Sequence, residues 1–304
     1  MADSGKKLDI GSLTAFLERV QSYTPDLIYF QGDVKSVHHY TDLEGLRGIT
    51  GAHDLWLTHS RYSNDDEELT HGYGIVRTVI RERLAKPLVD EQKRYLLALQ
   101  EELDGPTPES VYICCFCQSG DLLSQWRGYG ANGAGVSLSF DPAEFSYITG
   151  PDSPSYGLLR MWSVFYSNAT QRNIVGEALD FGAQTGASLE QRVARAADAI
   201  RFFIPTFKNE LFAEEKEVRL IFTPAADAQV PHPDFRVARG MLVPYYRLHT
   251  LSGSPTVPRL LPLQAVRVGP SARKDLNAEA VRLLLAKAGY GNIVVDVSST
   301  PYRG

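Results

Sequence analysis

The sequence has few cysteines, and they are placed where no disulfide framework could form. Only three occur in 304 residues, and Cys114, Cys115 and Cys117 all lie in one apolar stretch. Neighbouring cysteines on a strand cannot form the bridges of a small secreted domain. A fourth metal ligand of the usual CxxC type is absent, so we favour reduced core cysteines over a reactive or metal-binding role.

The sequence also lacks long apolar runs. No segment approaches the roughly 18–20 consecutive apolar residues of a membrane-spanning helix, and residues 1–7 lack the apolar stretch of a secretion signal. We therefore expect a cytoplasmic protein with no membrane partner. The net charge of −5 argues against a large basic nucleic-acid footprint, although it is compatible with a local basic groove.

The composition that remains is that of a globular protein. Hydrophobic residues make up 43% of the chain and charged residues 22%, which supplies enough apolar material for a sizeable core. Nothing repeats at a fixed period, and no stretch rich in Pro, Gly or Ser is long enough to separate domains. We expect a single domain over residues 1–304, with residues 1–35 as a helical N-terminal extension.

Hydrophobic periodicity predicts an α+β fold. Strands are expected at residues 37–41, 55–58, 111–116, 133–140, 161–166, 217–222, 241–246, 265–268 and 292–297. Helices are expected at 11–22, 42–49, 67–103 with an interruption near Pro87, 189–211 with a break at Pro205, and 277–288. Consecutive strands without regular helix alternation favour a mixed or antiparallel sheet over a doubly wound one.

Two polar groups lie in the first quarter of the chain. On the expected strand 37–41, His39 and Thr41 point to one face, and His38 and Tyr40 point to the other. Residues 60–68 carry several carboxylates, which either cap the following helix or bind a divalent cation beside a histidine. Their spacing matches no metal motif, so capping is the simpler interpretation.

Two further groups follow later in the sequence. Residues 125–130 lead into Gly133 and Gly135, where the backbone could approach a phosphate, although neither GxGxxG nor Walker spacing is present. Glu215, Glu217 and Arg219 share one face of an expected strand. Taken alone, that trio could equally be a solvent-exposed edge of ion pairs.

In their order along the chain, these groups resemble a bacterial family, formerly a domain of unknown function, that is placed with the ADP-ribosyltransferase-like proteins. The resemblance extends from about residue 37 to the end of the chain. It implies an α+β core with a split mixed or antiparallel sheet and flanking helices, and NAD as co-substrate. The matching blocks are His39-Tyr40-Thr41, Leu55-Trp56-Leu57-Thr58, Asn64-Asp65, Cys115-Phe116, Leu122 to Tyr129, Gly135 to Asp141, Glu215 to Arg219, Val268-Gly269-Pro270 and Ser298 to Arg303.

The diphtheria-toxin-like branch of that superfamily implies roles for several residues. There, a histidine on the first strand holds the adenine-side ribose, and a late glutamate holds the reacting ribose. His39, with Thr41 two residues later, matches the first role by position, and Glu217 matches the second. Glu215 would then orient or deprotonate the acceptor, and Arg61 would bind a pyrophosphate oxygen as a planar donor.

Two tyrosines sandwich nicotinamide in that branch. Tyr62 and Tyr73, with ten residues between them, match by spacing, and Tyr129 is the rival. The chemistry explains the residue types, because cleavage of the nicotinamide–ribose bond develops an oxocarbenium-like cation. A carboxylate bonded to the ribose 2′-hydroxyl strengthens its contact as that charge grows.

The resemblance implies an NAD-dependent mono-ADP-ribosyltransferase that modifies a macromolecular acceptor, either nucleic acid or protein. Toxins and phage-defence effectors act in this way, sometimes with an antitoxin or regulatory partner. An NAD glycohydrolase and a non-catalytic nucleotide-binding module are compatible with the same residues. A metal-dependent nuclease built on His38, Asp65 and Glu67 is a further alternative, which inhibition by a chelator would reveal.

Overall fold

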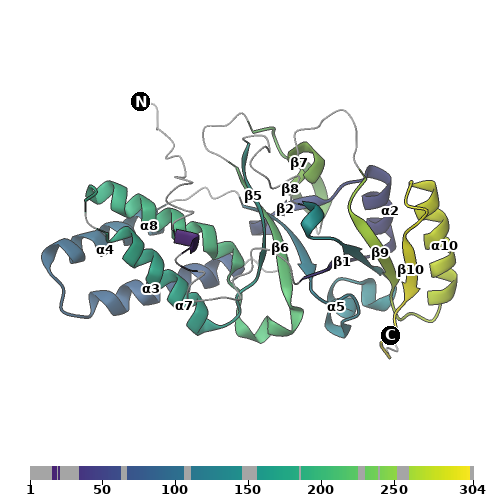
Figure 1. The fold of residues 1–304 in the computed structure, drawn as a ribbon, viewed down its shortest axis with the longest axis horizontal. Coiled ribbons are helices and arrows are strands. Elements are labelled where there is room, and N and C mark those ends of the chain that lie inside the picture. Colours follow the sequence, from purple (N-terminus) through teal and green to yellow (C-terminus); the bar gives the residue numbers. More distant parts are fainter. Residues whose placement is uncertain are drawn as a thin grey trace.

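The chain folds around one ten-stranded mixed sheet that carries helices at both ends (Figure 1). This computed structural model describes residues 16–18, 20, 34–62, 67–105, 111–145, 156–184, 186–224, 230–238, 240–251 and 260–301. The predicted α+β class is confirmed. Most of the predicted helix at residues 11–22 lies outside the described residues, although residues 16–18 and 20 are helical and Phe16 is buried.

The sheet has the strand order β10-β9-β4-β1-β3-β2-β8-β7, and β6 pairs with both β3 and β5. The β9–β10 pair is parallel and the other pairs are antiparallel. The strands are β1 (Val37–Thr41), β2 (Trp56–His59), β3 (Tyr112–Cys117), β4 (Val136–Phe140), β5 (Gly157–Ser163), β6 (Glu217–Pro224), β7 (Asp234–Ala238), β8 (Met241–Arg247), β9 (Leu263–Val268) and β10 (Val294–Val297).

The helices gather in two groups (Figure 1). The first projects from one end of the sheet and contains α3 (Glu67–Leu84), α4 (Asp90–Asp104), α7 (Asn168–Gly182) and α8 (Leu189–Phe203). The second lies at the other end and contains α2 (Leu43–Ala52) and α10 (Lys274–Lys287). Shorter helical pieces are η1 (Ser60–Tyr62), α5 (Leu123–Gly128), η2 (Ala131–Gly133), η3 (Ala143–Phe145), η4 (Ile204–Thr206), η5 (Glu210–Glu215) and α9 (Leu248–Leu251).

Local signals explain several boundaries. The Asp42 carboxylate accepts a hydrogen bond from Gly45 N at 2.6 Å and so caps α2. Pro87 falls between α3 and α4, and Pro205 lies in η4 directly after α8, because proline cannot continue a helical hydrogen-bond ladder. The sequence did not predict α7 or β7, and both bear on the site described below.

Two hydrophobic cores lie on opposite faces of the central strands. Ile113 and Ile221 face the core built by α3, α4, α7 and α8. Cys114 and Leu220, one residue away on each strand, face the core that packs beneath α2, α9 and α10. This alternation is what a strand buried on both faces requires.

The central strand β3 is fully hydrogen-bonded along one edge but not along the other. On the first edge, β6 pairs with the full length of β3. On the other edge, β2 reaches only Ile113 and Tyr112, and β1 reaches only Cys117. The sheet therefore splits between β1 and β2 opposite residues 114–116, and the gap exposes backbone groups of β3 that other partners must satisfy.

Gly135 is the point where the turn after α5 crosses β1, and we expect it to tolerate no side chain. A Cβ at this position would lie 2.2 Å from the Thr41 carbonyl oxygen and 3.0 Å from Gly130 backbone atoms. Gly135→Ala should therefore lower the free energy of unfolding by ~1–3 kcal/mol, as overpacking does. Urea denaturation would measure this change.

Gly74→Ala is the matched control, because Gly74 lies exposed in α3 and its added Cβ would meet nothing within 4 Å. Removing a glycine from a helix interior should stabilise the protein by up to ~1 kcal/mol. Equal effects of the two substitutions would contradict the close crossing at Gly135.

Candidate functional site

A pocket of about 220 Å³ opens at the split between β1 and β2. Its walls come from β1, β2, η1, β3, α5, η5, β6 and β7, which lie far apart in the sequence. The residues that line it are His38, His39, Tyr40, Trp56, Thr58, Tyr62, Ile113, Cys114, Cys115, Phe116, Gln125, Tyr129, Lys208, Glu215, Glu217 and Arg236.

The pocket brings together most of the residues predicted from the sequence. His39 comes from β1, Tyr62 from η1 and Tyr129 from the residue that ends α5. Glu215 ends η5, and Glu217 begins β6. These five side chains span almost 180 residues of sequence, so their convergence is a property of the fold rather than of local spacing.

Three predicted residues do not line the pocket. Thr41 is the last residue of β1 and packs against the first turn of α2, where a Cβ on Gly45 would meet its hydroxyl. Arg61 is exposed on η1. Tyr73, on α3, is partly buried against the helical core. Of the residues expected for a nuclease, His38 lines the pocket, whereas Asp65 and the side chain of Glu67 lie outside the described residues.

His39 occupies the gap in the ladder of β3. Its Nδ1 lies 2.9 Å from the carbonyl oxygen of Cys115, a residue that lies outside the backbone pairing of β3 with β1 and β2. A carbonyl can only accept, so Nδ1 carries the proton and Nε2 keeps a lone pair. Burial lowers the pKa of His39, although the bond to Cys115 acts in the opposite direction. The ring is therefore a neutral acceptor for a ligand hydroxyl near pH 7.

Glu217 is held by two cations. Its Oε1 accepts from Arg219 Nε at 2.8 Å, and its Oε2 accepts from Arg219 Nη2 at 2.9 Å and from Lys208 Nζ at 3.0 Å. Burial raises the pKa of Glu217, but Arg219, Lys208 and the Cys115 thiol outweigh burial and lower it to about 2. Glu217 is consequently ionised throughout the physiological range.

Glu215 is the less constrained carboxylate. Its Oε2 accepts from Lys208 Nζ at 2.6 Å, and this is the contact that the structure describes for it. The Glu215 side chain is 17% exposed, against 7% for Glu217 and 5% for Lys208. The pocket thus presents two carboxylates and one ammonium group, with Arg219 fully buried behind them.

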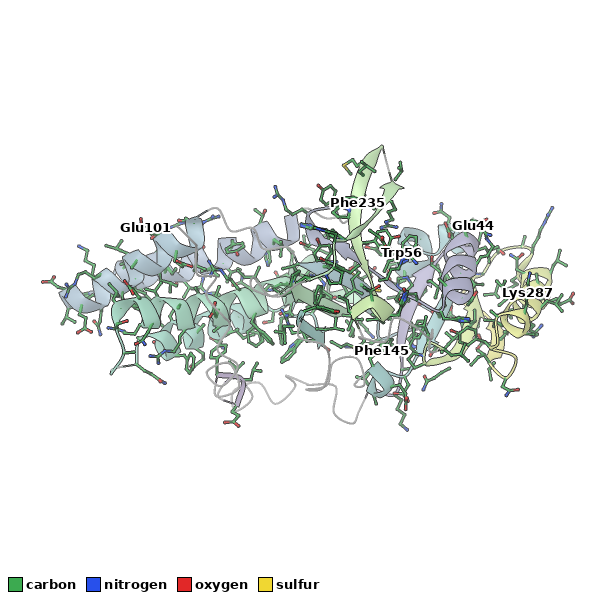
Figure 2. All side chains as sticks on the ribbon, turned by 90° about the horizontal axis from the view of Figure 1, so that it is seen from above. Glu44, Trp56, Glu101, Phe145, Phe235 and Lys287 are labelled. Carbon is green, nitrogen blue, oxygen red and sulfur yellow. The ribbon has the colours of Figure 1, made fainter. Side chains whose placement is uncertain are left out.

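Aromatic side chains form the outer walls. Trp56, labelled in Figure 2, stacks on Tyr245 with ring centroids 4.4 Å apart and is 41% exposed. Tyr62 and Tyr129 are also partly exposed. Burial and the neighbouring Glu215 raise the pKa of Tyr129, so its phenol stays protonated. Flat, partly buried aromatic side chains of this kind can pack against an aromatic ligand ring.

Lys208, Arg236 and Gln125 are pocket residues that the sequence analysis did not single out. Gln125 is the first residue of the 125–130 segment that the sequence analysis singled out, so its position in that segment was a usable signal. Lys208 precedes its two glutamate partners by seven and nine residues, and the contact depends on η5 turning back. Arg236 lies on β7, a strand that the sequence did not predict.

Asp121 fastens α5 to the C-terminal segment. Its carboxylate accepts from the Trp126 indole at 2.8 Å, the Thr300 hydroxyl at 2.9 Å, the Ser298 hydroxyl, and Ser299 N at 3.1 Å. Burial raises the pKa of Asp121, but these hydrogen bonds outweigh burial and lower it. Trp126 is fully buried and leads directly to Tyr129, so Asp121 positions one wall of the pocket.

Asp121→Ala should lower the free energy of unfolding by ~1–3 kcal/mol, because it leaves the buried Trp126 N–H without its acceptor. The difference from wild type should shrink as the pH falls through the depressed pKa of Asp121, since a carboxyl with a lowered pKa stabilises only while ionised. Urea denaturation at several pH values would measure both effects. Asp275→Ala, exposed in the first turn of α10, should change stability little.

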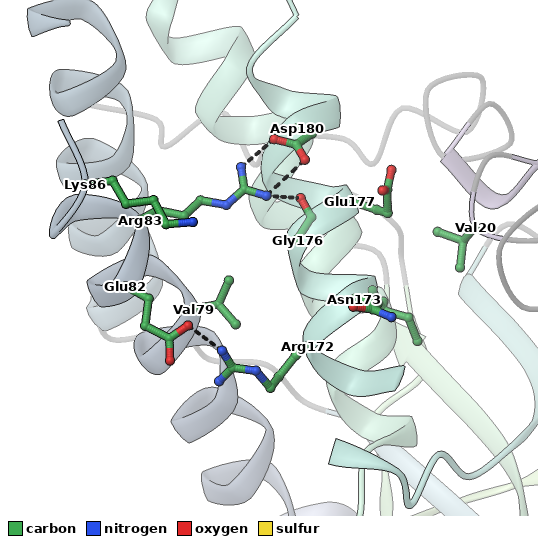
Figure 3. A pocket seen from close by; sticks show the side chains of 11 residues that line it. Val20, Val79, Glu82, Arg83, Lys86, Arg172, Asn173, Gly176, Glu177 and Asp180 are labelled. Carbon is green, nitrogen blue, oxygen red and sulfur yellow. Dashed lines mark hydrogen bonds and ion pairs between the residues drawn. The ribbon is translucent and has the colours of Figure 1, made fainter. Parts of the chain in front are cut away.

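A larger pocket of about 520 Å³ lies between α3 and α7 (Figure 3). Four of its charged residues are paired across the two helices: Arg83 bonds Asp180 and the Gly176 carbonyl, and Arg172 bonds Glu82. These ion pairs connect neighbouring helices, and none of the residues predicted for NAD lines this pocket. Despite its smaller size, the pocket at the split is the candidate functional site.

Comparison with known proteins gives one family. The profile of a family described as a protein of unknown function, DUF2971, matches residues 125–220. The matched stretch begins at Gln125 in the pocket wall and includes Tyr129, Lys208, Glu215 and Glu217. No curated protein and no solved structure matches the chain.

Within the described residues, no helix is long and apolar enough to cross a membrane. No cluster of three or more His, Cys, Asp or Glu side chains in the described part of the chain could hold a metal ion.

Proposed function

We propose that the protein transfers ADP-ribose from NAD to a macromolecular acceptor. The observation that carries this proposal is the convergence of His39, Tyr129, Glu215 and Glu217 on one pocket. The resemblance gives three of them, His39, Tyr129 and Glu217, a contact with NAD, and it gives Glu215 a contact with the acceptor. Four residues from three separate stretches of sequence would not meet at one opening by local spacing alone.

The groups around the pocket match the parts of a dinucleotide. A partly exposed aromatic wall suits the flat nicotinamide ring. The Nε2 lone pair of His39 can accept from a ribose hydroxyl, because Nδ1 is fixed as the donor to Cys115. The free oxygen of Glu215 can accept from a second hydroxyl, while Glu217 stays charged beside it.

The reaction requires stabilisation of positive charge. The bond between nicotinamide and ribose C1′ breaks, its electron pair leaves with nicotinamide, and the ribose becomes oxocarbenium-like. The two pocket carboxylates, Glu215 and Glu217, face this developing charge and are already oriented by Lys208 and Arg219. An acceptor nucleophile then bonds to C1′ and loses its proton, for which Glu215 is the available base.

The test of this proposal is the fate of NAD carrying a labelled adenylate, incubated with purified protein. We expect nicotinamide release that depends on an added cell lysate, and label that becomes attached to a macromolecule. His39→Ala should weaken NAD binding roughly tenfold, the equivalent of one lost hydrogen bond. His232→Ala is the control, because His232 is exposed and does not line the pocket.

The other outcomes are distinct. Free ADP-ribose that accumulates equally without lysate would identify an NAD glycohydrolase. Tight NAD binding without nicotinamide release would identify a nucleotide-binding module. Labelling that survives His39→Ala unchanged would show that the reaction occurs elsewhere on the protein.

A further inference from the structure

We propose that Arg236, with Thr58 and Trp56, forms an anion subsite that binds the pyrophosphate of the dinucleotide. This inference rests on the proposed function, since it assigns part of the same ligand. It also fixes the direction in which that ligand lies across the pocket.

Arg236 lacks a carboxylate partner within the described residues. Its Nη2 donates to the Thr58 hydroxyl at 3.2 Å, and its guanidinium carbon lies 5.7 Å from the centroid of the Trp56 ring. Its Nε is buried and makes no hydrogen bond to any described residue. By contrast, the pocket ammonium of Lys208 is bonded to two carboxylates.

A half-buried guanidinium in this state is suited to an anionic ligand. Arginine has five donor hydrogens in a planar fork, and Thr58 takes only one of them. Burying a cation without a counter-charge costs desolvation free energy. A phosphate that accepts two parallel hydrogen bonds from the guanidinium offsets that cost. The Trp56 ring, 5.7 Å from the guanidinium carbon, and the Thr58 hydroxyl hold the side chain at the pocket wall, which Arg236 lines.

The sheet separates this cation from the carboxylates. Glu217 is on β6 and Arg236 is on β7, with β3, β2 and β8 between these strands. Figure 2 shows the β7–β8 hairpin, marked by Phe235, standing out from the sheet with Trp56 near its base. The pyrophosphate therefore lies toward the hairpin, and the reacting ribose lies toward β6, where negative charge favours an oxocarbenium ion.

This assignment replaces Arg61 as the pyrophosphate ligand. Arg61 is exposed on η1 and does not line the pocket, whereas Arg236 does. The two assignments predict opposite effects of Arg61→Ala and Arg236→Ala on binding of the pyrophosphate. Measuring both variants therefore decides between them.

The experiment is calorimetric titration of the full-length protein with ADP and, separately, with adenosine. ADP carries the pyrophosphate but cannot undergo the reaction, and adenosine lacks the phosphates. Arg236→Ala should weaken ADP binding by about 10- to 100-fold, as loss of charge-assisted hydrogen bonds does, and should change adenosine binding little. Arg236→Lys should recover part of the loss, because it keeps the charge but not the fork.

Arg273→Ala is the control variant, since Arg273 is exposed beside α10 and outside the pocket. Thermal melting of each variant would separate lost binding from lost folding. Wild-type affinity for ADP in Arg236→Ala, or failure of the wild-type protein to bind ADP, would overturn the subsite. A loss confined to Arg61→Ala would overturn it in favour of η1.

The two proposals fail in different ways. ADP binding that depends on Arg236, in a protein that releases no nicotinamide, would support the subsite and contradict the proposed function. Nicotinamide release that is unaffected by Arg236→Ala at low NAD concentration would support the function and contradict the subsite.

Discussion

Lys208→Met should lower the free energy of unfolding by ~3–5 kcal/mol, the usual effect of removing one partner from a buried ion pair. Lys208 is only 4% exposed, and its ammonium lies between the carboxylates of Glu215 and Glu217. Methionine preserves much of the side-chain volume but leaves two buried carboxylates facing each other with only Arg219 as counter-charge. Urea denaturation at pH 7 would measure the loss.

The pH dependence of the stability loss in Lys208→Met shows whether it comes from the carboxylate of Glu217. Glu217 has a native pKa lowered from 4.5 to about 2, so its ionisation stabilises the wild-type fold above about pH 4.5. That contribution is lost as the pH falls toward 2. In Lys208→Met the pKa of Glu217 should rise, and the difference in stability between variant and wild type should therefore shrink at low pH.

Lys93→Met is the control, because Lys93 is exposed on α4. It should leave the unfolding free energy within about 0.5 kcal/mol of wild type. A Lys208→Met protein as stable as this control at pH 7 would contradict the buried Lys208–glutamate cluster.

Glu217→Gln should slow nicotinamide release by ~10²–10³-fold, the effect expected when one preorganised charge contact to the transition state is removed. Glutamine keeps the shape of the side chain but loses the charge that Arg219 and Lys208 hold in place. The rate constant at saturating NAD should fall more than the affinity for NAD, because the charge acts on the oxocarbenium ion rather than on the ground state.

Glu214→Gln is the matched control for this experiment, since Glu214 is exposed on η5 one residue before Glu215. It should retain the wild-type rate. Binding of ADP to Glu217→Gln would show that the pocket is still formed. If the rate fell equally in both variants, the loss would come from any removal of charge near the start of β6 and not from the pocket carboxylate in particular.

Strong local signals made much of the fold predictable. The strand at 37–41 was recognised by its β-branched and aromatic residues, and the start of α2 by its Asp42 cap. The resemblance points to His39 and Glu217, and strand alternation predicts that Glu217 and Arg219 share one face, where they are hydrogen-bonded. Such features depend on neighbours in sequence, so a single chain is enough to find them.

Other elements depend on contacts that the sequence does not display. In α7, Gln171 is fully buried and donates to the carbonyls of Phe165 and Lys208, so a polar residue interrupts the apolar face. In β7, Phe235 and Val237 are exposed, so apolar alternation does not indicate burial there. Arg236 was missed along with that strand.

Spacing alone was the weakest guide to the pocket. Tyr62 and Tyr73 were paired by their separation, but only Tyr62 lines the pocket, and Tyr73 packs against the helical core. Tyr129 does line it, because Asp121 and Trp126 anchor α5 beside β1. Contacts between distant segments, rather than intervals along the chain, decide which aromatic residues reach a ligand.

The most direct test of the central claim is nicotinamide release from NAD by the purified protein, wild type beside Glu217→Gln, with and without cell lysate. The account predicts release by the wild type that requires lysate and is lost in Glu217→Gln, together with transfer of labelled ADP-ribose to a macromolecule. Absence of release by the folded wild-type protein under every condition would contradict it, and so would release that persists unchanged in Glu217→Gln.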